Sequence, residues 1–276
     1  LGLVGFQMGT LAYNSASFKL DNTYLGVIGE MGGHKINDFA SSISDANNQK
    51  TASHPYLTLA KANECVSEQT IVPNPLATDA KSAANNVLKV VTTPDSDTSK
   101  SNHLINTILP STSTPSAEAN GVYVIEFDIL SDAANELPQD NAIFMQIVPD
   151  SASGYFQIFR LTHKGDGKIE FKAERGGNGG GKEATFGTVT LLDGQWHNVR
   201  FVMNKGGTET TVALYVDGTL VSEKNVYFQV VAVENSQPIN RVHWRIREFA
   251  PSGEATSATY YYDNVAVGYL GDLPEN

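Results

Sequence analysis

The segment TTVALYVDGTLVSE, residues 210–223, constrains the fold of this chain more than any other short stretch. An Asp-Gly pair separates two runs of strand-forming residues, and this arrangement is the strongest short signal for a β-hairpin. A period of two recurs in GVYVIEFDIL, residues 121–130, where Tyr123, Ile125, Phe127 and Ile129 would share one face. Both segments therefore predict strands with one buried face.

Similar runs recur at regular intervals through the second half of the chain, at residues 142–148, 155–163, 168–174, 195–204, 241–249 and 258–270. Turn-forming residues separate these runs, and helical patterns are almost missing. Many short strands at such spacing are typical of a two-sheet antiparallel β-sandwich or jelly roll. The sequence therefore predicts an all-β fold of that kind.

The first 120 residues are less regular. Residues 1–55 would hold N-terminal strands and loops whose place the sequence does not fix, and residues 77–88 can carry one short helix. Residues 92–120 are rich in Ser, Thr, Pro and Asp, which favours an exposed loop. Because a jelly roll of this type needs strands from both halves of the chain, we expect a single domain over residues 1–276.

Composition and charge exclude several classes of partner. The net charge of −11 disfavours nonspecific binding to nucleic acid, although a local basic surface is compatible with it. No apolar run approaches the roughly 18 residues that a membrane-spanning helix needs. The single cysteine, Cys65, cannot form an internal disulfide, and no Cys/His cluster has the spacing of a zinc site. The oligomeric state stays open.

The segment RVHWRIREF, residues 241–249, is unusual in a chain this acidic. With the period of a strand, it places four basic residues on one face and three apolar residues on the other. The basic residues are Arg241, His243, Arg245 and Arg247, and the apolar residues are Val242, Trp244 and Ile246. This cationic face is the main candidate for a functional surface.

Two further motifs carry a resemblance to known families. The run LLDGQWHNVRFVMN…TTVALYVDGTLVSE resembles the laminin-G and concanavalin A-like sandwich superfamily, and YYYDNVAVG is similar to the closing strand of jelly-roll polysaccharide lyases of the heparinase I and alginate lyase type. The order of motifs along residues 121–270 also resembles that of these lyases. The resemblance implies a concanavalin A-like jelly roll in a secreted bacterial protein, extracellular or at the cell surface, that acts on carbohydrate.

The chain departs from these lyases at the positions that matter for chemistry. Their Q-[IW]-H motif corresponds to Gln146-Ile147-Val148, so its histidine is missing. Arg245 takes the place of a lysine, and Phe249 falls where the catalytic tyrosine would be. A laminarinase-like hydrolase is less favoured, because EFDIL at residues 126–130 begins like the E-x-D-x-E motif but ends in Leu130.

Cleavage of a uronic acid polymer by β-elimination needs a cation that neutralises the carboxylate, a base for the C5 proton and an acid for the leaving oxygen. Arg245 would be the cation and His243 the base, with Tyr262 or Tyr260 as the acid. These roles require the strands over 241–249 and 258–270 to pair, so that arginine, histidine and tyrosine share one face. The polymer would be an acidic polysaccharide, because arginine pairs well with carboxylate and sulfate.

The same hypothesis names residues that would hold the sugar. They comprise two arginines of the cationic face, polar side chains of neighbouring strands, a second basic lip near residue 160, and one asparagine: Arg241, Arg247, Gln146, Gln157, Tyr155, Arg160, His163 and Asn264.

Other interpretations remain open at this point. The arginine face can be an ordinary solvated strand face, since charged residues usually lie at the surface. The chain can equally be a non-catalytic carbohydrate-binding or adhesion module, or a structural surface protein whose residues 1–13 complete a neighbour's sheet. We expect no required cofactor, with a structural calcium at Asp263 as the open alternative. His197, in QWHNV, is interpreted as structural, and Trp196 and Trp244 as core residues rather than sugar platforms.

Overall fold

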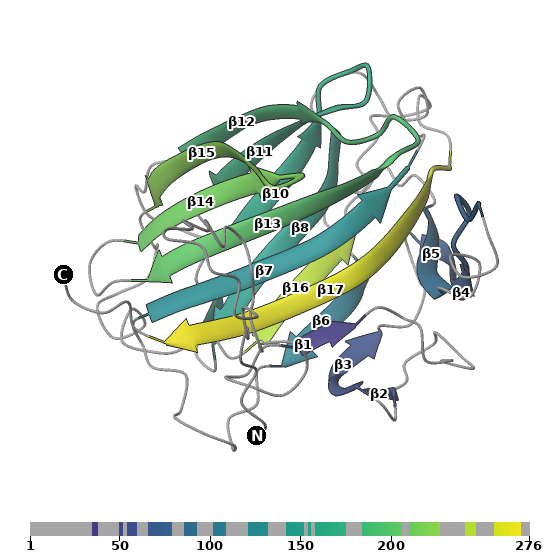
Figure 1. Cartoon of the computed structure of the whole chain (residues 1–276), viewed down its shortest axis with the longest axis horizontal. Coiled ribbons are helices and arrows are strands. Elements are labelled where there is room, and N and C mark those ends of the chain that lie inside the picture. The colour runs from purple at the N-terminus through teal and green to yellow at the C-terminus, as the bar shows by residue number, and fades with distance from the viewer. Residues whose placement is uncertain are drawn as a thin grey trace, which may run out of the picture.

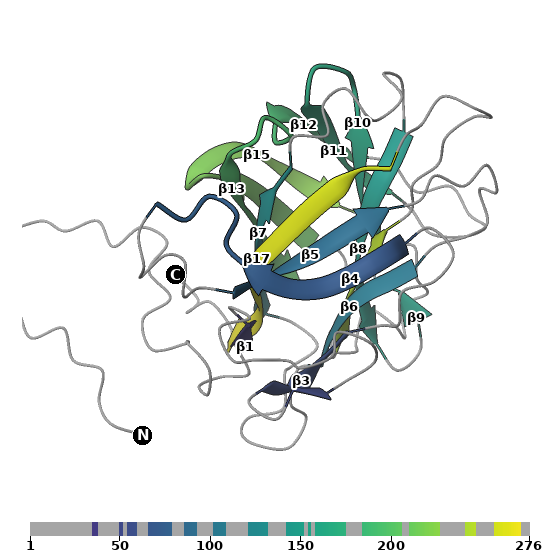
Figure 2. The ribbon, with the colours of Figure 1, turned by 90° about the vertical axis from the view of Figure 1, so that its right-hand side faces the viewer.

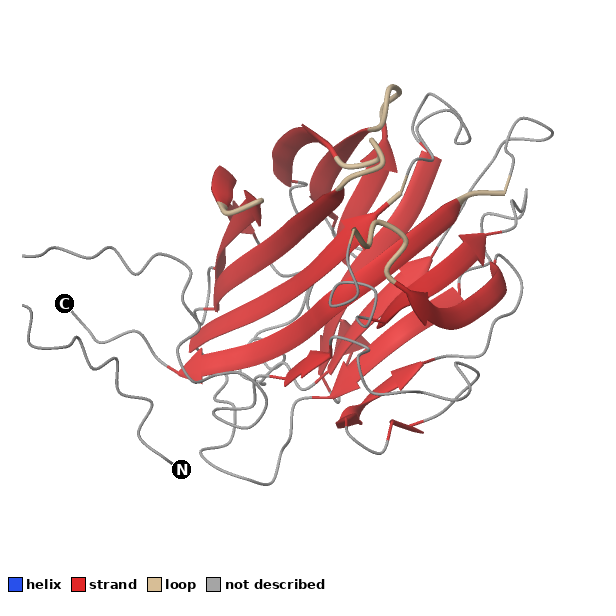
Figure 3. Cartoon of the chain, turned by 45° about the vertical axis from the view of Figure 1, so that its right-hand side comes forward, coloured by secondary structure: helices blue, strands red, loops and turns tan. Residues whose placement is uncertain are grey.

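The computed structural model describes residues 35–37, 50–51, 54–59, 66–78, 86–92, 102–108, 121–131, 142–151, 154–155, 158–174, 184–205, 210–226, 241–246 and 257–271. Within these residues every regular element is a β-strand, and Figure 3 draws them as strands, with turns in tan between some of them. The expected all-β fold is therefore confirmed. No helix in this part of the chain is long and apolar enough to cross a membrane.

One of the two sheets, called sheet A here, has eight strands in the described part of the chain, all paired antiparallel. Their spatial order is β15 (Thr219–Val226), β14 (Thr210–Val216), β13 (Trp196–Lys205), β7 (Gly121–Leu130), β17 (Thr259–Gly271), β5 (Asn86–Thr92) and β4 (Val66–Pro73), and β1 (Lys35–Asn37) also pairs with β17. Figure 2 shows β5 and β4 continuing the sheet beyond β17.

The second sheet, sheet B, has nine strands in the described residues and is also antiparallel. Their order is β12 (Ala184–Thr190), β11 (Lys168–Glu174), β10 (Ile158–His163), β8 (Ala142–Ser151), β16 (Arg241–Ile246), β6 (Asn102–Ile108), β3 (His54–Leu59) and β2 (Lys50–Thr51), and β9 (Gly154–Tyr155) also pairs with β8. Figure 1 shows sheet A in front, with β17 beside β7, and β16 in the layer behind. Strands from both halves of the chain thus build both sheets.

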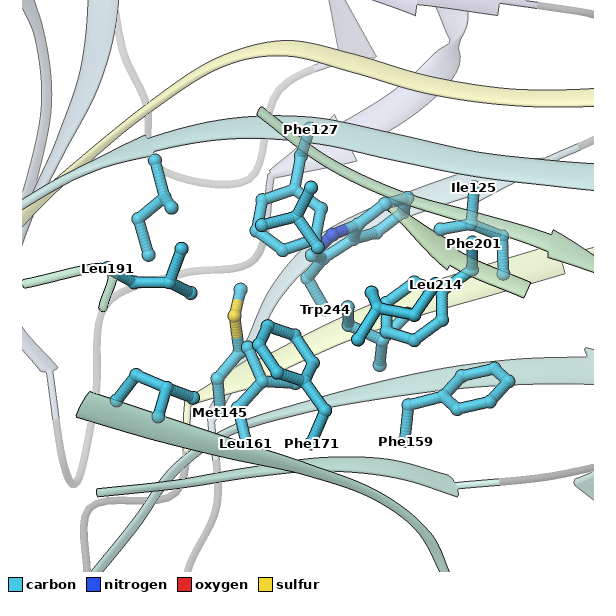
Figure 4. Close-up of a cluster of buried hydrophobic side chains, with 14 of the residues drawn as sticks. Ile125, Phe127, Met145, Phe159, Leu161, Phe171, Leu191, Phe201, Leu214 and Trp244 are labelled. Atoms are coloured by element: carbon cyan, nitrogen blue, oxygen red, sulfur yellow. The ribbon is translucent and has the colours of Figure 1, made fainter. Parts of the chain in front are cut away.

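The core lies between the two sheets and is formed by every second residue of the central strands. Tyr123, Ile125, Phe127 and Ile129 of β7 are buried, as the alternation predicts. The facing aromatic rings come from opposite sheets: Phe201 of β13 stacks on Phe159 of β10 with ring centroids 4.5 Å apart. Phe127 of β7 meets the edge of Trp244 of β16 at 6.4 Å and 84° (Figure 4). Burial of each such side chain stabilises the fold by about 1.5–3 kcal/mol.

The hairpin predicted from the Asp-Gly pair is present between β14 and β15. Val216 and Thr219 are register partners, which leaves a two-residue turn. Asp217 and Gly218 have φ angles of 50° and 74°, both positive, as a type I′ turn requires.

The free edges of the two sheets meet at β12 and β15, which contact each other. A Cβ at Gly187 of β12 would lie 3.1 Å from Val221 Cγ1 of β15, and the φ of Gly187 is 151°. Glycine at this position therefore permits the close approach of the two edge strands.

Three local expectations were wrong. Residues 102–108 of the expected loop form β6, a strand inside sheet B, and residues 86–88 of the expected short helix belong to β5. The strands over 241–246 and 259–271 do not pair, since β16 lies in sheet B and β17 in sheet A. In each case pairing with distant strands, which the local sequence does not encode, decides the outcome.

Candidate functional site

The strand β16 separates its two faces as its period predicts. Val242 and Trp244 are fully buried in the core between the sheets, so the interpretation of Trp244 as a core residue is confirmed. His243 lies on the outer face of sheet B and is 5% exposed. Arg241 and Arg245 occupy strand positions of the same parity as His243. The strand positions of Arg241, His243 and Arg245 therefore belong to the outer face of sheet B.

The register of sheet B aligns four residues from four neighbouring strands. Arg245 of β16 is paired with Gln146 of β8, Gln146 with Arg160 of β10, and Arg160 with Lys172 of β11. We call these four positions the cation row. Their sequence neighbours Trp244, Ile147, Phe159 and Phe171 are core residues, which assigns the row to the outer face. With neighbouring strands about 4.8 Å apart, the row spans about 14 Å.

The cation row continues into an ion-paired cluster at its β11 end. Lys172 Nζ lies 3.2 Å from Glu170 Oε1, and Lys164 Nζ lies 3.7 Å from the same oxygen. The side chains of all three residues are partly exposed, whereas Gln146 is 3% exposed. Sequence reasoning missed Glu170 and Lys172, because a strand such as KIEFKAE shows no sign of its register with Arg160.

A second line of register partners crosses β16 beside the cation row. His243 is paired with Val148 of β8 on one side and with Asn106 of β6 on the other. Farther along the strand, Arg241 is paired with Asp150, which is also the register partner of Tyr155 on β9. Of the predicted sugar contacts, Gln146, Arg160, Arg241 and Tyr155 thus share sheet B with His243.

The two candidate tyrosines do not join this face. Tyr260 and Tyr262 lie on β17 of sheet A, and both are fully buried in the core. The ring of Tyr262 lies 6.5 Å from that of Phe127. The expectation that these tyrosines share a face with His243 was therefore wrong, because β16 and β17 belong to different sheets.

Asn264 and Asp263 lie at an irregularity of β17 on the other side of the molecule. The register between β17 and β7 shifts between Asp263 and Ala266, and Asn264 is exposed with a φ of 48°. A β-bulge therefore places Asn264 at the surface, although Tyr260 and Tyr262 of the same strand are buried. The backbone N–H of Asn264 donates to Asp263 Oδ1 at 2.8 Å.

His163 was expected to form part of an exposed basic lip, and this expectation was wrong. Its side chain is fully buried at the end of β10, and its register partner on β11 is the core residue Ile169. The exposed position falls one residue later, at Lys164. Arg247 and Gln157 lie outside the described residues.

The outer face of sheet A carries a different polar arrangement, which sequence reasoning also missed. Asn198 Nδ2 donates to Glu126 Oε1 and to Asp128 Oδ1, both at 2.8 Å, and Asn264 Nδ2 donates to Asp128 Oδ2 at 2.6 Å. We call these four residues the carboxylate–amide network. Burial raises the pKa of Glu126 and of Asp128 above their usual range, although the amide hydrogen bonds act in the opposite direction.

His197 is the second residue of β13, and two carboxylates hold its ring. Its Nδ1 lies 2.8 Å from Asp217 Oδ2 and its Nε2 lies 3.0 Å from Asp193 Oδ1. Burial alone would lower the pKa of His197, but the hydrogen bonds to Asp217 and Asp193 raise it. The histidine ties the β14–β15 turn to the segment before β13, which supports its interpretation as structural. Trp196 is partly exposed, and its indole Nε1 donates to Asn74 Oδ1 at 3.2 Å.

In the part of the chain that the structure describes, no group of three or more His, Cys, Asp or Glu side chains could hold a metal ion. Asp263 itself is 5% exposed.

Comparison with known proteins agrees with the architecture. A sequence model described as the concanavalin A-like lectin/glucanases superfamily matches residues 133–249. The chain folds as a concanavalin A-like two-sheet sandwich, as the motifs implied. No curated protein matches the sequence.

Several solved alginate lyases match the structure. Alginate lyase vAL-1 from Chlorella virus is 10% identical with a TM-score of 0.48, over 74% of this chain and 89% of that one. Alginate lyase A1-II′, a member of polysaccharide lyase family 7, is 14% identical with a TM-score of 0.45, over 75% and 86%. Alginate lyase Aly36B is 9% identical with a TM-score of 0.44, over 88% and 100%.

Proposed function

We propose that the outer face of sheet B binds an acidic polysaccharide and that the protein, acting outside the cell, cleaves its uronic acid units by β-elimination. The observation that carries this proposal is the cation row, in which Arg245, Gln146, Arg160 and Lys172 are register partners across four strands. Strand spacing sets these positions about 4.8 Å apart, a distance comparable to one sugar ring of a polymer chain. A polyanion that crosses the strands would meet one polar or cationic group per strand.

In this proposal Arg245 neutralises the carboxylate of the reacting unit, which makes its C5 proton more acidic. His243 removes that proton, the electron pair forms the C4–C5 double bond, and the C4–O glycosidic bond breaks. What supports His243 is its register with Val148, because the lyases that the sequence resembles carry a histidine at that position of their Q-[IW]-H motif. The base is thus provided by the adjacent strand.

The departing oxygen needs a proton, and we assign this role to Tyr155. The register aligns Tyr155 with Asp150, and Asp150 with Arg241. This tyrosine replaces Tyr260 and Tyr262 in the scheme, since both are buried in the core. Gln146 and Arg160 would hold the neighbouring sugar units.

A second candidate function is a non-catalytic module that binds the same polymer. It is favoured by the low exposure of His243, which is 5%, because a general base must reach its substrate. Both functions use the cation row, so they differ only in whether a bond is broken.

The test is incubation with a panel of uronate-containing polysaccharides, with the ultraviolet absorbance of the unsaturated product as readout. We expect absorbance growth with at least one polymer, and loss of that growth in His243→Ala, Arg245→Ala and Tyr155→Phe. Lys89→Ala, a change on the outer face of sheet A, should leave the rate unchanged. Retarded migration in polymer-containing gels without any absorbance growth would support the binding module. If no polymer gives absorbance growth or retarded migration, both functions are refuted.

A further inference from the structure

We propose that the carboxylate of Glu170 occupies, in the unbound protein, a subsite for a carboxylate of the polymer, and that it competes with the polymer for Lys172 and Lys164. This inference rests on the proposed function and extends it, because it names a specific subsite and the residue that controls it. Glu170 would then determine how strongly a polymer must be charged before it binds at the β11 end of the cation row.

The contacts of Glu170 support this role. One oxygen, Oε1, lies 3.2 Å from Lys172 Nζ and 3.7 Å from Lys164 Nζ. A carboxylate held between two ammonium groups has the arrangement that a sugar carboxylate would adopt at the same place. The lysine side chains are 23% and 32% exposed, whereas Glu170 is 16% exposed. The cations are therefore accessible to solvent, and the anion that pairs with them lies deeper.

The position of the pair relative to Arg160 makes the subsite specific. Lys172 is the register partner of Arg160, one strand away, so the two positions are about 4.8 Å apart. A polymer with a carboxylate on every ring could pair with Arg160 and Lys172 at once. A polymer with a carboxylate on every second ring would pair with only one of them, and Lys172 would stay with Glu170.

The weakness of partly exposed ion pairs allows a polymer carboxylate to replace Glu170 as the partner of Lys172 and Lys164. Partly exposed ion pairs between lysine and carboxylate are weak, and a polymer carboxylate can replace the internal one at little expense. Each exchange still has to break contacts of Glu170 with Lys172 and Lys164. Removing the negative charge of Glu170 should therefore strengthen binding of the densely charged polymer.

The experiment measures affinity by titration calorimetry for Glu170→Gln and the unaltered protein. The two probes are a polyuronate with a carboxylate on every ring and a glycosaminoglycan with one carboxylate per disaccharide and no sulfate. We expect Glu170→Gln to bind the polyuronate about three- to tenfold more tightly, and to change the affinity for the sparser polymer less than about twofold. In Lys172→Ala the polyuronate affinity should fall, and adding Glu170→Gln to Lys172→Ala should restore little of it.

Glu68→Gln is the matched control. Glu68 Oε2 pairs with Lys89 Nζ at 3.0 Å on sheet A, so this variant removes a comparable ion pair away from the cation row. Its polymer affinity should be unchanged. Suppose that Lys172→Ala binds the polyuronate more weakly but Glu170→Gln binds it no more tightly than the unaltered protein. This result would overturn the proposed competition by Glu170 and leave the proposed function standing. Absence of polyuronate binding by the unaltered protein and by Glu170→Gln would overturn both.

Discussion

The two outer faces of this sandwich share one core and one strand period, yet they arrange their charges in opposite ways. On sheet A, the carboxylates of Glu126 and Asp128 accept hydrogen bonds from Asn198, and Asn264 donates to Asp128. On sheet B, three basic residues and one glutamine follow one another across four strands, and two partly exposed lysines share a single carboxylate oxygen. The comparison teaches that carboxylates held by amide donors form a structural network, whereas partly exposed lysines form a surface that a ligand can reach.

The electrostatics of the two faces follow from this difference. In the carboxylate–amide network, burial raises the pKa of Glu126 and Asp128, so both carboxyls carry their charge at an energetic cost. The amide donors reduce this cost without removing it. On sheet B, solvent screens the ion pairs of Glu170, and a ligand can exchange with it.

The largest expected effect comes from reversing charge on sheet B. Arg160→Glu combined with Lys172→Glu should weaken binding of a polyuronate at least about 100-fold, because two charge-assisted contacts become repulsive. Lys89→Glu on sheet A should leave binding within about twofold. Titration calorimetry gives both affinities, and equal losses in the two variants would erase the distinction between the faces.

The next effect concerns the network on sheet A. Asn198→Ala removes the donor that Glu126 and Asp128 share, and should lower the free energy of unfolding at neutral pH by about 2 kcal/mol. The loss should shrink in acid, where the carboxyls bind protons. Urea unfolding at both pH values measures this, with Asn204→Ala, an exposed position of β13, as the control. A loss that does not depend on pH would contradict the account.

A smaller change with the opposite sign is expected for Glu126→Gln. Because the pKa of Glu126 is raised in the folded state, the ionised carboxyl lowers stability above that pKa, and acidification through it removes the penalty. The neutral amide should therefore raise the free energy of unfolding at neutral pH by roughly 0.5 kcal/mol and flatten its rise toward acid pH. Reduced stability at neutral pH, with an unchanged pH profile, would show that burial does not dominate this site.

The smallest effect is expected at His197. Asp193→Asn removes one of its two carboxylate partners, so the raised pKa of His197 should move down. A histidine with a raised pKa stabilises the fold below its unfolded pKa, and this stabilisation is lost as the pH rises through the folded pKa. Titration of the imidazole by NMR gives the pKa directly. A histidine that titrates identically in both proteins would rule out the contribution of Asp193.

Much of the fold could be predicted because its signals are local. The alternation over 121–130 and the Asp-Gly turn at 217–218 each depend on residues that are adjacent in the chain. The strands β5 and β6 were missed for the opposite reason. β6 lies in a region rich in Ser, Thr and Pro, and its pairing with β16 brings together residues more than a hundred positions apart.

The site was predicted only in part, for the same physical reason. The strand period of two predicts the face of His243 and the core position of Trp244, and this period can be recognised in the sequence. The sheet to which a strand belongs does not follow from that period, so Tyr260 and Tyr262 were assigned to the wrong face. The bulge that turns Asn264 outward, and the register that aligns Arg160 with Lys172, depend on partner strands in the same way.

One measurement tests the central claim most directly, namely that the outer face of sheet B is the polymer-binding surface. Lysine acetylation read by mass spectrometry, with and without a polyuronate, compares Lys172 with Lys89, whose side chains are 23% and 26% exposed on opposite faces. The account predicts that the polymer protects Lys172 and Lys164 and leaves Lys89 as reactive as before. Protection of Lys89 with unchanged labelling of Lys172 would contradict it.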